Sequence, residues 1–205
     1  GNLTKAIELW EKAIELDPDD AKAYYNMGVA YDDQGNYTKA IELWEKAIEI
    51  DPDLAYAYNN LGIAYYDQGN YTKAIELYEK AIELDPDYAD TYNNLGLAYY
   101  DQGNLTKAIE LWEKAIELDP VLAMAYLNLG LAYKNQGNYD KAIQLYEKAI
   151  ELDPELAMAY NNLGLAYYDQ GNYTKAIESY KKAIEIDPDF ADAYYNMGLA
   201  YRKQG

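Results

Sequence analysis

The apolar residues of this chain recur with the spacing of α-helices, in two alternating patterns. In residues 71–84, Ala74, Ile75 and Tyr78 belong to one apolar stripe, whereas glutamates and lysines occupy the other side. A stripe at intervals of three and four residues is typical of an amphipathic helix with one buried face. The segment is therefore predicted to be a helix that packs through Tyr78 and its neighbours and exposes its acidic side.

The preceding segment, residues 54–68, differs from residues 71–84 because neither of its sides has the composition of a fully solvated surface. One side, which includes Leu61 and Gly62, is predicted to face the following helix. Gly62 would allow the aromatic ring of Trp44 or Tyr78 to approach closely. The opposite side holds Tyr56, Asn59, Asn60, Ile63, Tyr66 and Asp67. Because Asn and Gly are unfavourable inside helices, packing or ligand contacts must offset their presence.

Short polar signals separate the two kinds of helix. The corner Asp51-Pro52-Asp53 ends one helix, and Asp53 is predicted to cap the next. Gly69 is predicted to end that helix in a left-handed conformation, and Asn70 to cap the helix that follows. Each stretch of this kind therefore supplies a first helix and a second helix.

This two-helix stretch recurs with a constant period of 34 residues, marked by Gly1, Gly35, Gly69, Gly103, Gly137, Gly171 and Gly205. A fixed period between about 20 and 50 residues indicates stacked repeats. Residues 1–205 are therefore predicted to form a single solenoid instead of several globular domains. Its predicted parts are a half repeat with only a second helix (1–20), complete repeats (21–54, 55–88, 89–122, 123–156 and 157–190) and a half repeat with only a first helix (191–205).

The spacing of small and aromatic residues resembles the tetratricopeptide repeat (TPR) family. In residues 55–88 the marker positions of the family hold Tyr58, Leu61, Gly62, Tyr65, Ala74, Tyr78, Ala81 and Pro86. The pattern recurs in the other complete repeats, so the resemblance covers the entire chain. It implies an all-α fold, a right-handed superhelical solenoid of antiparallel helix pairs. It also implies that the first helices line a concave groove that binds extended segments of other proteins.

One asparagine per repeat occupies the same position of the first helix. This asparagine ladder consists of Asn26, Asn60, Asn94, Asn128, Asn162 and Asn196. It is similar to the ladder in the superhelical domain of the O-linked N-acetylglucosamine transferase, which implies that it holds the backbone of a bound peptide. An asparagine amide both donates and accepts, so it can pair with an extended chain of any sequence. The alternative is that each asparagine bonds neighbouring helices and only sets the stacking of the repeats.

Further positions complete the candidate peptide-binding groove. Beside the ladder lie the preceding asparagines Asn59, Asn93 and Asn161. The predicted apolar floor is Ile63, Leu97, Leu131 and Leu165, and the predicted rim is Tyr66, Tyr100 and Tyr168. The neighbouring acids favour a neutral or basic peptide: Asp32, Asp33, Asp67, Asp101 and Asp169. No first helix offers the paired cations with which many TPR domains hold the acidic C-terminus of chaperones, which argues against that ligand.

Composition excludes several classes of function. The net charge of -19 argues against a nucleic acid or an anionic membrane surface as the partner. The chain has no Cys and no His, which excludes thiol nucleophiles, thiolate zinc sites and imidazole acid–base catalysis. We therefore predict no catalytic residue, metal site or cofactor, and do not expect an enzyme. With no apolar run long enough to span a bilayer and no targeting segment, the expected location is cytoplasmic.

An Asn-X-Thr pattern at the start of the second helices, as in Asn70-Tyr71-Thr72, matches the acceptor for N-glycosylation. The repeat that reads Asn138-Tyr139-Asp140 breaks this pattern but keeps an asparagine suited to start a helix. Helix capping explains all of these asparagines and is the preferred interpretation.

The favoured function is a non-enzymatic scaffold that binds extended peptides. The alternative is a purely architectural module without a ligand, either a designed consensus array or part of a larger natural repeat protein. The near-identical repeats fit both origins. Because the half repeats leave apolar residues uncovered at both ends, among them Ile7, Trp10, Tyr194 and Tyr201, the chain is also predicted to associate head to tail.

Overall fold

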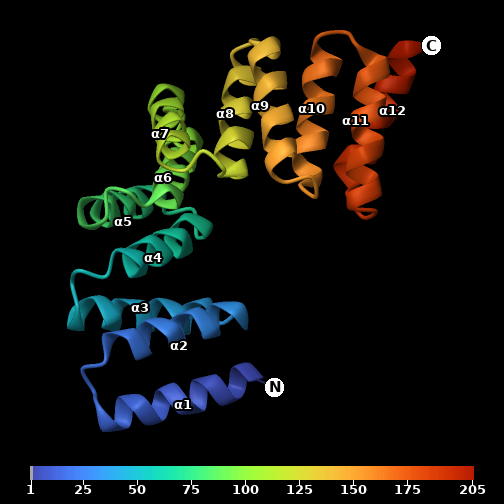
Figure 1. Cartoon of the computed structure of the whole chain (residues 1–205). Coiled ribbons are helices and arrows are strands. Elements are labelled where there is room, and N and C mark those ends of the chain that lie inside the picture. Colours follow the sequence, from blue (N-terminus) through green and yellow to red (C-terminus); the bar gives the residue numbers. More distant parts are fainter. Residues whose placement is uncertain (1) are drawn as a thin grey trace. The chain divides into compact units, whose positions relative to one another are not determined.

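The computed structural model describes residues 2–205, so Gly1, the first glycine of the repeat pattern, lies outside the described residues. Residues 2–205 form twelve α-helices and no β-strand (Figure 1), which confirms the predicted all-α repeat fold. The helices are α1 (Asn2–Leu16), α2 (Ala21–Asp33), α3 (Tyr37–Ile50), α4 (Ala55–Asp67), α5 (Tyr71–Leu84), α6 (Ala89–Asp101), α7 (Leu105–Leu118), α8 (Ala123–Asn135), α9 (Tyr139–Leu152), α10 (Ala157–Asp169), α11 (Tyr173–Ile186) and α12 (Ala191–Gln204).

The helices belong to two compact units, one ending at Asn104 and the other beginning at Leu105. In the first unit α2 pairs with α3 and α4 pairs with α5, while α1 packs on α2, α3 on α4, and α5 on α6. In the second unit α8 pairs with α9 and α10 with α11, while α7 packs on α8, α9 on α10, and α11 on α12. Inside each unit, second helices such as α3 and α9 therefore lie between two first helices. The single solenoid over residues 1–205 stays a prediction.

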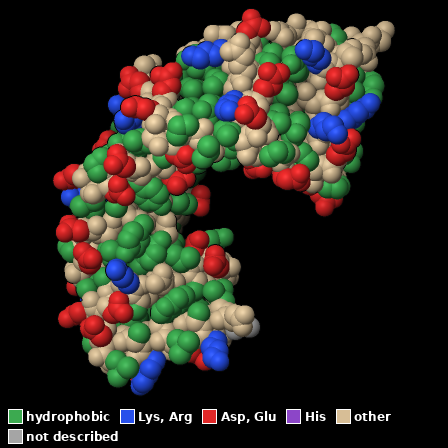
Figure 2. Space-filling model, in the orientation of Figure 1, with side chains coloured by type: hydrophobic (Ala, Val, Ile, Leu, Met, Phe, Trp, Pro, Cys, Tyr) green, Lys and Arg blue, Asp and Glu red, His purple; other side chains and the backbone are tan. Residues whose placement is uncertain are grey.

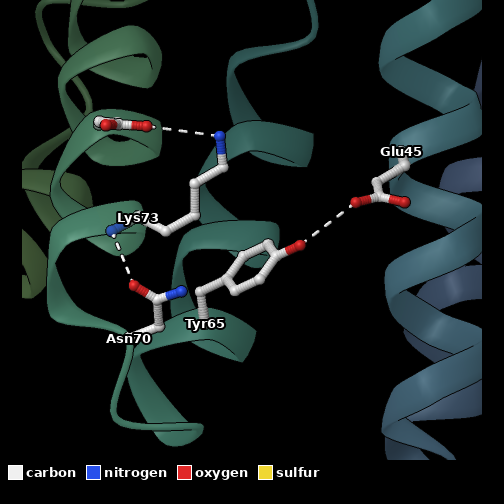
Figure 3. Close-up of polar contacts among 5 residues, drawn as sticks. Glu45, Tyr65, Asn70 and Lys73 are labelled. Carbon is white, nitrogen blue, oxygen red and sulfur yellow. Dashed lines mark hydrogen bonds and ion pairs between the residues drawn. The ribbon is translucent and has the colours of Figure 1, made fainter.

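The second helices begin at the predicted asparagine caps. Asn70 Oδ1 accepts a hydrogen bond of 3.3 Å from the backbone N–H of Lys73 (Figure 3). The same cap stands at the start of α3, α9 and α11. Just before Asn70, Gly69 has a φ of +75°, a left-handed conformation that costs glycine little. The predicted glycine and asparagine signals are thus confirmed at this boundary.

The prediction that Asp53 caps the following first helix is wrong. The N-cap residue of α4 is Leu54, which makes no side-chain cap, and Asp53 instead donates its backbone N–H to Asp51 Oδ1 at 3.1 Å. Leu54 is buried and packs with Ala21, Ala47 and Ala57. An apolar anchor at this position contributes burial that a capping side chain could not, and α2, which has Asp20 there, retains the side-chain cap.

The close approach predicted for the glycines of the first helices is confirmed at Gly28, Gly62, Gly130 and Gly164 but not at Gly198, where an added Cβ would meet nothing within 4 Å. A Cβ added to Gly62 would lie 2.6 Å from Cε1 of Tyr78, and one added to Gly28 would lie 2.5 Å from Nε1 of Trp44. The ring of Tyr78 is only 1% exposed. Each of these rings therefore packs directly on the backbone of the first helix.

Tyrosine hydroxyls connect the first helices α4, α6, α8 and α10 to the second helix of the preceding repeat. Tyr65 on α4 donates to Glu45 Oε1 on α3 at 3.3 Å (Figure 3). Equivalent bonds join Tyr99 to Glu79, Tyr133 to Glu113, and Tyr167 to Glu147. Burial raises the pKa of Tyr65, and Glu45 raises it further. Because the ring packs while its hydroxyl reaches a surface carboxylate, tyrosine suits this position better than phenylalanine.

Acidic side chains are spread over the face of the molecule that Figure 2 shows.

Candidate functional site

The asparagine ladder forms hydrogen bonds between successive first helices. Asn60 Nδ2 donates to the hydroxyl of Tyr25 at 3.2 Å, and Asn94 Nδ2 donates to Asn59 Oδ1 at 3.1 Å. In the second unit Asn196 Nδ2 donates to Asn161 Oδ1 at 3.1 Å. Each bond joins residues that are 35 positions apart. These members therefore bond neighbouring first helices to each other, and their role toward a ligand stays a prediction.

The described residues offer no side-chain hydrogen bond to two other ladder members, Asn26 and Asn162, which are both half-buried. For Asn162, the position 35 residues earlier is the apolar Leu127, which cannot accept a hydrogen bond. Asn128 is more deeply buried than the rest of the ladder. The ladder is thus chemically uneven, because some of its amides are paired within the fold and others keep their donors and acceptors available.

The asparagines that precede the ladder, Asn59, Asn93 and Asn161, are buried. Asn59 is 3% exposed and is the centre of a small network. Its Oδ1 accepts from Thr91 Oγ1 at 3.2 Å as well as from Asn94, and its Nδ2 donates to Asn60 Oδ1 at 3.3 Å. Asn59 therefore has little surface left for a peptide.

The predicted floor and rim residues are only partly covered. Ile63 remains 38% exposed, and Leu97, Leu131 and Leu165 are half-buried. The rim tyrosines Tyr66, Tyr100 and Tyr168 are half-buried too. Tyr66 donates its hydroxyl to Asp101 and packs its ring 5.3 Å from that of Tyr71. Burial raises the pKa of Tyr66, and the bond to Asp101 raises it further, so this hydroxyl stays a donor at neutral pH.

In the first unit several predicted residues line one pocket of about 780 Å³ between α2, α3 and α4. It brings Asn60 of the ladder and Ile63 of the floor together with the neighbouring acids Asp32, Asp33 and Asp67. Burial raises the pKa of Asp32, and the carboxylates of Asp33 and Asp67 raise it further. A smaller hollow of about 380 Å³ is lined by Lys22, Tyr25, Asn26 and Tyr56.

Sequence reasoning missed Thr91 and Trp44 as contributors to this surface. Thr91 stands where the other repeats have alanine, and that exchange was the signal for its buried hydrogen bond. Tyr25 accepts from Asn60, and its ring meets that of Tyr56 edge-on at 4.4 Å. Trp44 was expected to pack on glycine but also lines the large pocket.

Within the part of the chain that the structure describes, no cluster of three or more acidic side chains is arranged to hold a metal ion. Over residues 2–205, every helix is too short or too polar to cross a membrane. What the first helices do offer is a set of amides, half-buried aliphatic and aromatic side chains, and carboxylates. Such groups can bind another molecule by hydrogen bonding, apolar burial and charge.

Several solved structures have a fold similar to that of this chain. The crystal structure of YrrB, described as a TPR protein with an unusual peptide-binding site, is 30% identical, with a TM-score of 0.69, and covers 94% of this chain and 100% of its own. MamA is 35% identical, with a TM-score of 0.66, and covers 83% of this chain and 93% of its own. The APC/C hetero-tetramer Cut9–Hcn1 has a TM-score of 0.88 over 97% of this chain and 40% of its own, but at 21% identity it shows the fold alone.

A search of curated protein sequences finds no match. Family models match along the chain. One model, described as TPR repeat, matches residues 1–35, 30–69, 64–103 and 164–205, and models described as tetratricopeptide repeat match residues 87–155 and 145–178. With these matches added to the paired helices and the glycine–aromatic contacts, the chain belongs to the tetratricopeptide repeat family.

Proposed function

We propose that this chain is a non-enzymatic interaction scaffold that binds an extended peptide segment along its first helices. The observation that carries the proposal is the state of Asn26 and Asn162, whose half-buried amides have no side-chain partner among the described residues. Both side chains keep part of their surface in contact with solvent, so a peptide backbone, which supplies both a donor and an acceptor, can pair with them. The likeness to YrrB, which is described as having a peptide-binding site, supports the same function.

The energetics favour a ligand that makes many small contacts. Each amide–backbone hydrogen bond contributes only about 0.5–1.5 kcal/mol. Partly exposed residues such as Ile63 and Leu165 add apolar surface beside the ladder. The net charge of -19 and the carboxylates of Asp32, Asp33 and Asp67 favour a neutral or basic peptide over an acidic one. Affinity would thus come from repetition and selectivity from charge.

We expect Asn162→Ala to weaken binding to most sequences of an arrayed nonapeptide library while changing stability little. The reason is that Asn162 makes no side-chain hydrogen bond to the described residues, so its removal costs the ligand a contact and the fold none. The measurements are the array signal, fluorescence anisotropy with the strongest peptides, and urea unfolding of the free protein.

Asn94→Ala is the matched comparison, because Asn94 bonds to Asn59 and its loss should lower stability as well. Unchanged binding by the Asn162 variant would leave only the architectural alternative for the ladder.

We propose head-to-tail association of this 205-residue chain as a second property, on the basis of its terminal helices. Leu9 on α1 is 62% exposed, whereas Leu43, at the same repeat position, is 5% exposed because α1 and α2 cover it. On α12, Tyr195 is 69% exposed, and Tyr194 and Tyr201 are also exposed. The two surfaces differ from each other, so their contact would be head-to-tail and would propagate instead of closing a dimer.

We expect Leu9→Glu to reduce any concentration-dependent association of the chain, because a carboxylate would be buried at the contact. Sedimentation velocity at moderate salt measures it, since salt screens the repulsion between highly charged chains. Leu16→Glu, at an exposed position at the end of α1, serves as a partial control, because it adds the same charge at another position. A wild-type chain that stays monomeric at high protein concentration would contradict the proposal.

A further inference from the structure

The large pocket of the first unit has apolar walls and an acidic edge. Val29 and Ile63 from neighbouring first helices and Trp44 from α3 supply apolar surface. Asp32, Asp33 and Asp67 supply carboxylates, and no lysine or arginine of the described residues lines the pocket. Its volume of about 780 Å³ is sufficient for a large side chain together with part of a backbone.

At this pocket Asp32 occupies the position at which the next repeat has a tyrosine. One repeat later the equivalent residue is Tyr66, whose ring packs on Tyr71 and whose hydroxyl donates to Asp101. The equivalents of Tyr71 and Asp101 in the earlier repeat are Tyr37 and Asp67, which both line the pocket. An aspartate is too short to fill this space and, when ionised, has no proton to donate. The exchange therefore leaves both an opening and an unpaired carboxylate at Asp67.

Asp32 and Asp67 are both carboxylates, whereas the equivalent pair in the next repeat, Tyr66 and Asp101, is a hydrogen-bond donor and its acceptor. Burial raises the pKa of Asp32, and the charges of Asp33 and Asp67 raise it further. At the pocket wall Trp44 is 2% exposed, and its indole N–H has no acceptor among the described residues. That N–H is buried against Gly28, so the polar groups left unsatisfied at the opening are the carboxylates. A ligand that carries a cation would satisfy them.

We infer that this pocket binds an arginine side chain of the extended peptide. This inference rests on the proposed function, because Asn60 at the pocket edge would hold the adjoining peptide backbone. The apolar walls suit the aliphatic stem of arginine, and its planar guanidinium can meet two carboxylates at once and stack on an aromatic ring. A metal ion fits less well, because it needs oxygen ligands that converge on one point, and the described acids here form no such group.

Asp32→Tyr tests the inference by restoring the residue that the neighbouring repeat uses. The new ring should fill the pocket and donate to Asp67, so the variant is expected to fold. The probes are N-acetyl-arginine methylamide and its uncharged citrulline counterpart. Both are titrated while the indole N–H resonance of Trp44, assigned with Trp44→Phe, is followed by NMR.

We expect the arginine probe to shift this resonance and to bind at least about tenfold more tightly than the citrulline probe, as charge-assisted hydrogen bonds are lost with citrulline. The Asp32→Tyr variant should lose the response. Asp32→Asn, which keeps the shape and removes one charge, should lose most of the preference. Glu49→Gln, which removes an exposed charge of α3 that does not line the pocket, should not. Equal shifts with both probes, or an unchanged response in Asp32→Tyr, would overturn the inference.

The converse variant, Tyr66→Asp, should open a second pocket beside Asp67 and Asp101 and create a second arginine-selective site. The outcomes also separate this inference from the proposed function. Library peptides that bind without preferring arginine at any position would overturn the pocket and leave the scaffold. A pocket that responds to the arginine probe in a chain that binds no library peptide would support the pocket and refute the scaffold.

Discussion

Replacing Gly62 by alanine should lower the free energy of unfolding by about 1–3 kcal/mol, the usual cost of overpacking a filled core. Helix propensity alone predicts the opposite, because alanine is favoured over glycine by about 1 kcal/mol inside a helix. Packing decides the sign, since the new methyl would lie 2.6 Å from Cε1 of Tyr78, which is almost fully buried and cannot swing away. Urea unfolding followed by far-UV circular dichroism measures the change.

Gly198→Ala is the matched control, because Gly198 occupies the same repeat position as Gly62 but has no aromatic ring packed on it. In α12 a Cβ on Gly198 meets nothing within 4 Å. This variant should be stabilised by up to about 1 kcal/mol, the helix-propensity difference alone. Effects of the same sign at Gly62 and Gly198 would show that the contact with Tyr78 does not determine the outcome.

Asn59→Ala should destabilise the protein by about 1–3 kcal/mol, the cost of leaving buried polar groups without partners. The buried hydroxyl of Thr91 would lose its acceptor, and the amide of Asn94 would lose its bond between first helices. Urea unfolding again gives the measurement. A second variant, Asn59→Ala combined with Thr91→Ala, removes both ends of the buried bond and should recover part of the loss.

Asn26→Ala is the contrasting variant, for which the smallest change in the free energy of unfolding is expected. Asn26 is half-buried, and no described residue bonds its side chain, so the substitution should leave the free energy of unfolding nearly unchanged or slightly raised. If Asn59→Ala proved as mild as Asn26→Ala, the network around Asn59 would contribute nothing to the stacking of the first helices.

The sequence by itself determined the helices and most of their ends. Gly69 and Asn70 act on the backbone within a few residues of their own positions, so their roles could be read directly. The contact between Gly62 and Tyr78 was also predictable, because a fixed spacing within one helix pair implies it. Asp53 failed as a predicted cap because the adjacent Leu54 is drawn into the core of its repeat, which is a tertiary effect.

Only the tertiary structure decided what the asparagines and the acids do. On a helical wheel Asn59 and Asn60 share one side, yet stacking of the next first helix buries Asn59 and leaves Asn60 at the edge of a pocket. The partners of these amides lie 35 residues away, and the pocket depends on Asp32 facing Asp67 of the following repeat. Capping signals act over a few residues of one chain segment, whereas side-chain pairing depends on how whole repeats pack. For that reason the pattern of residues could point to the surface but not to its hydrogen bonds.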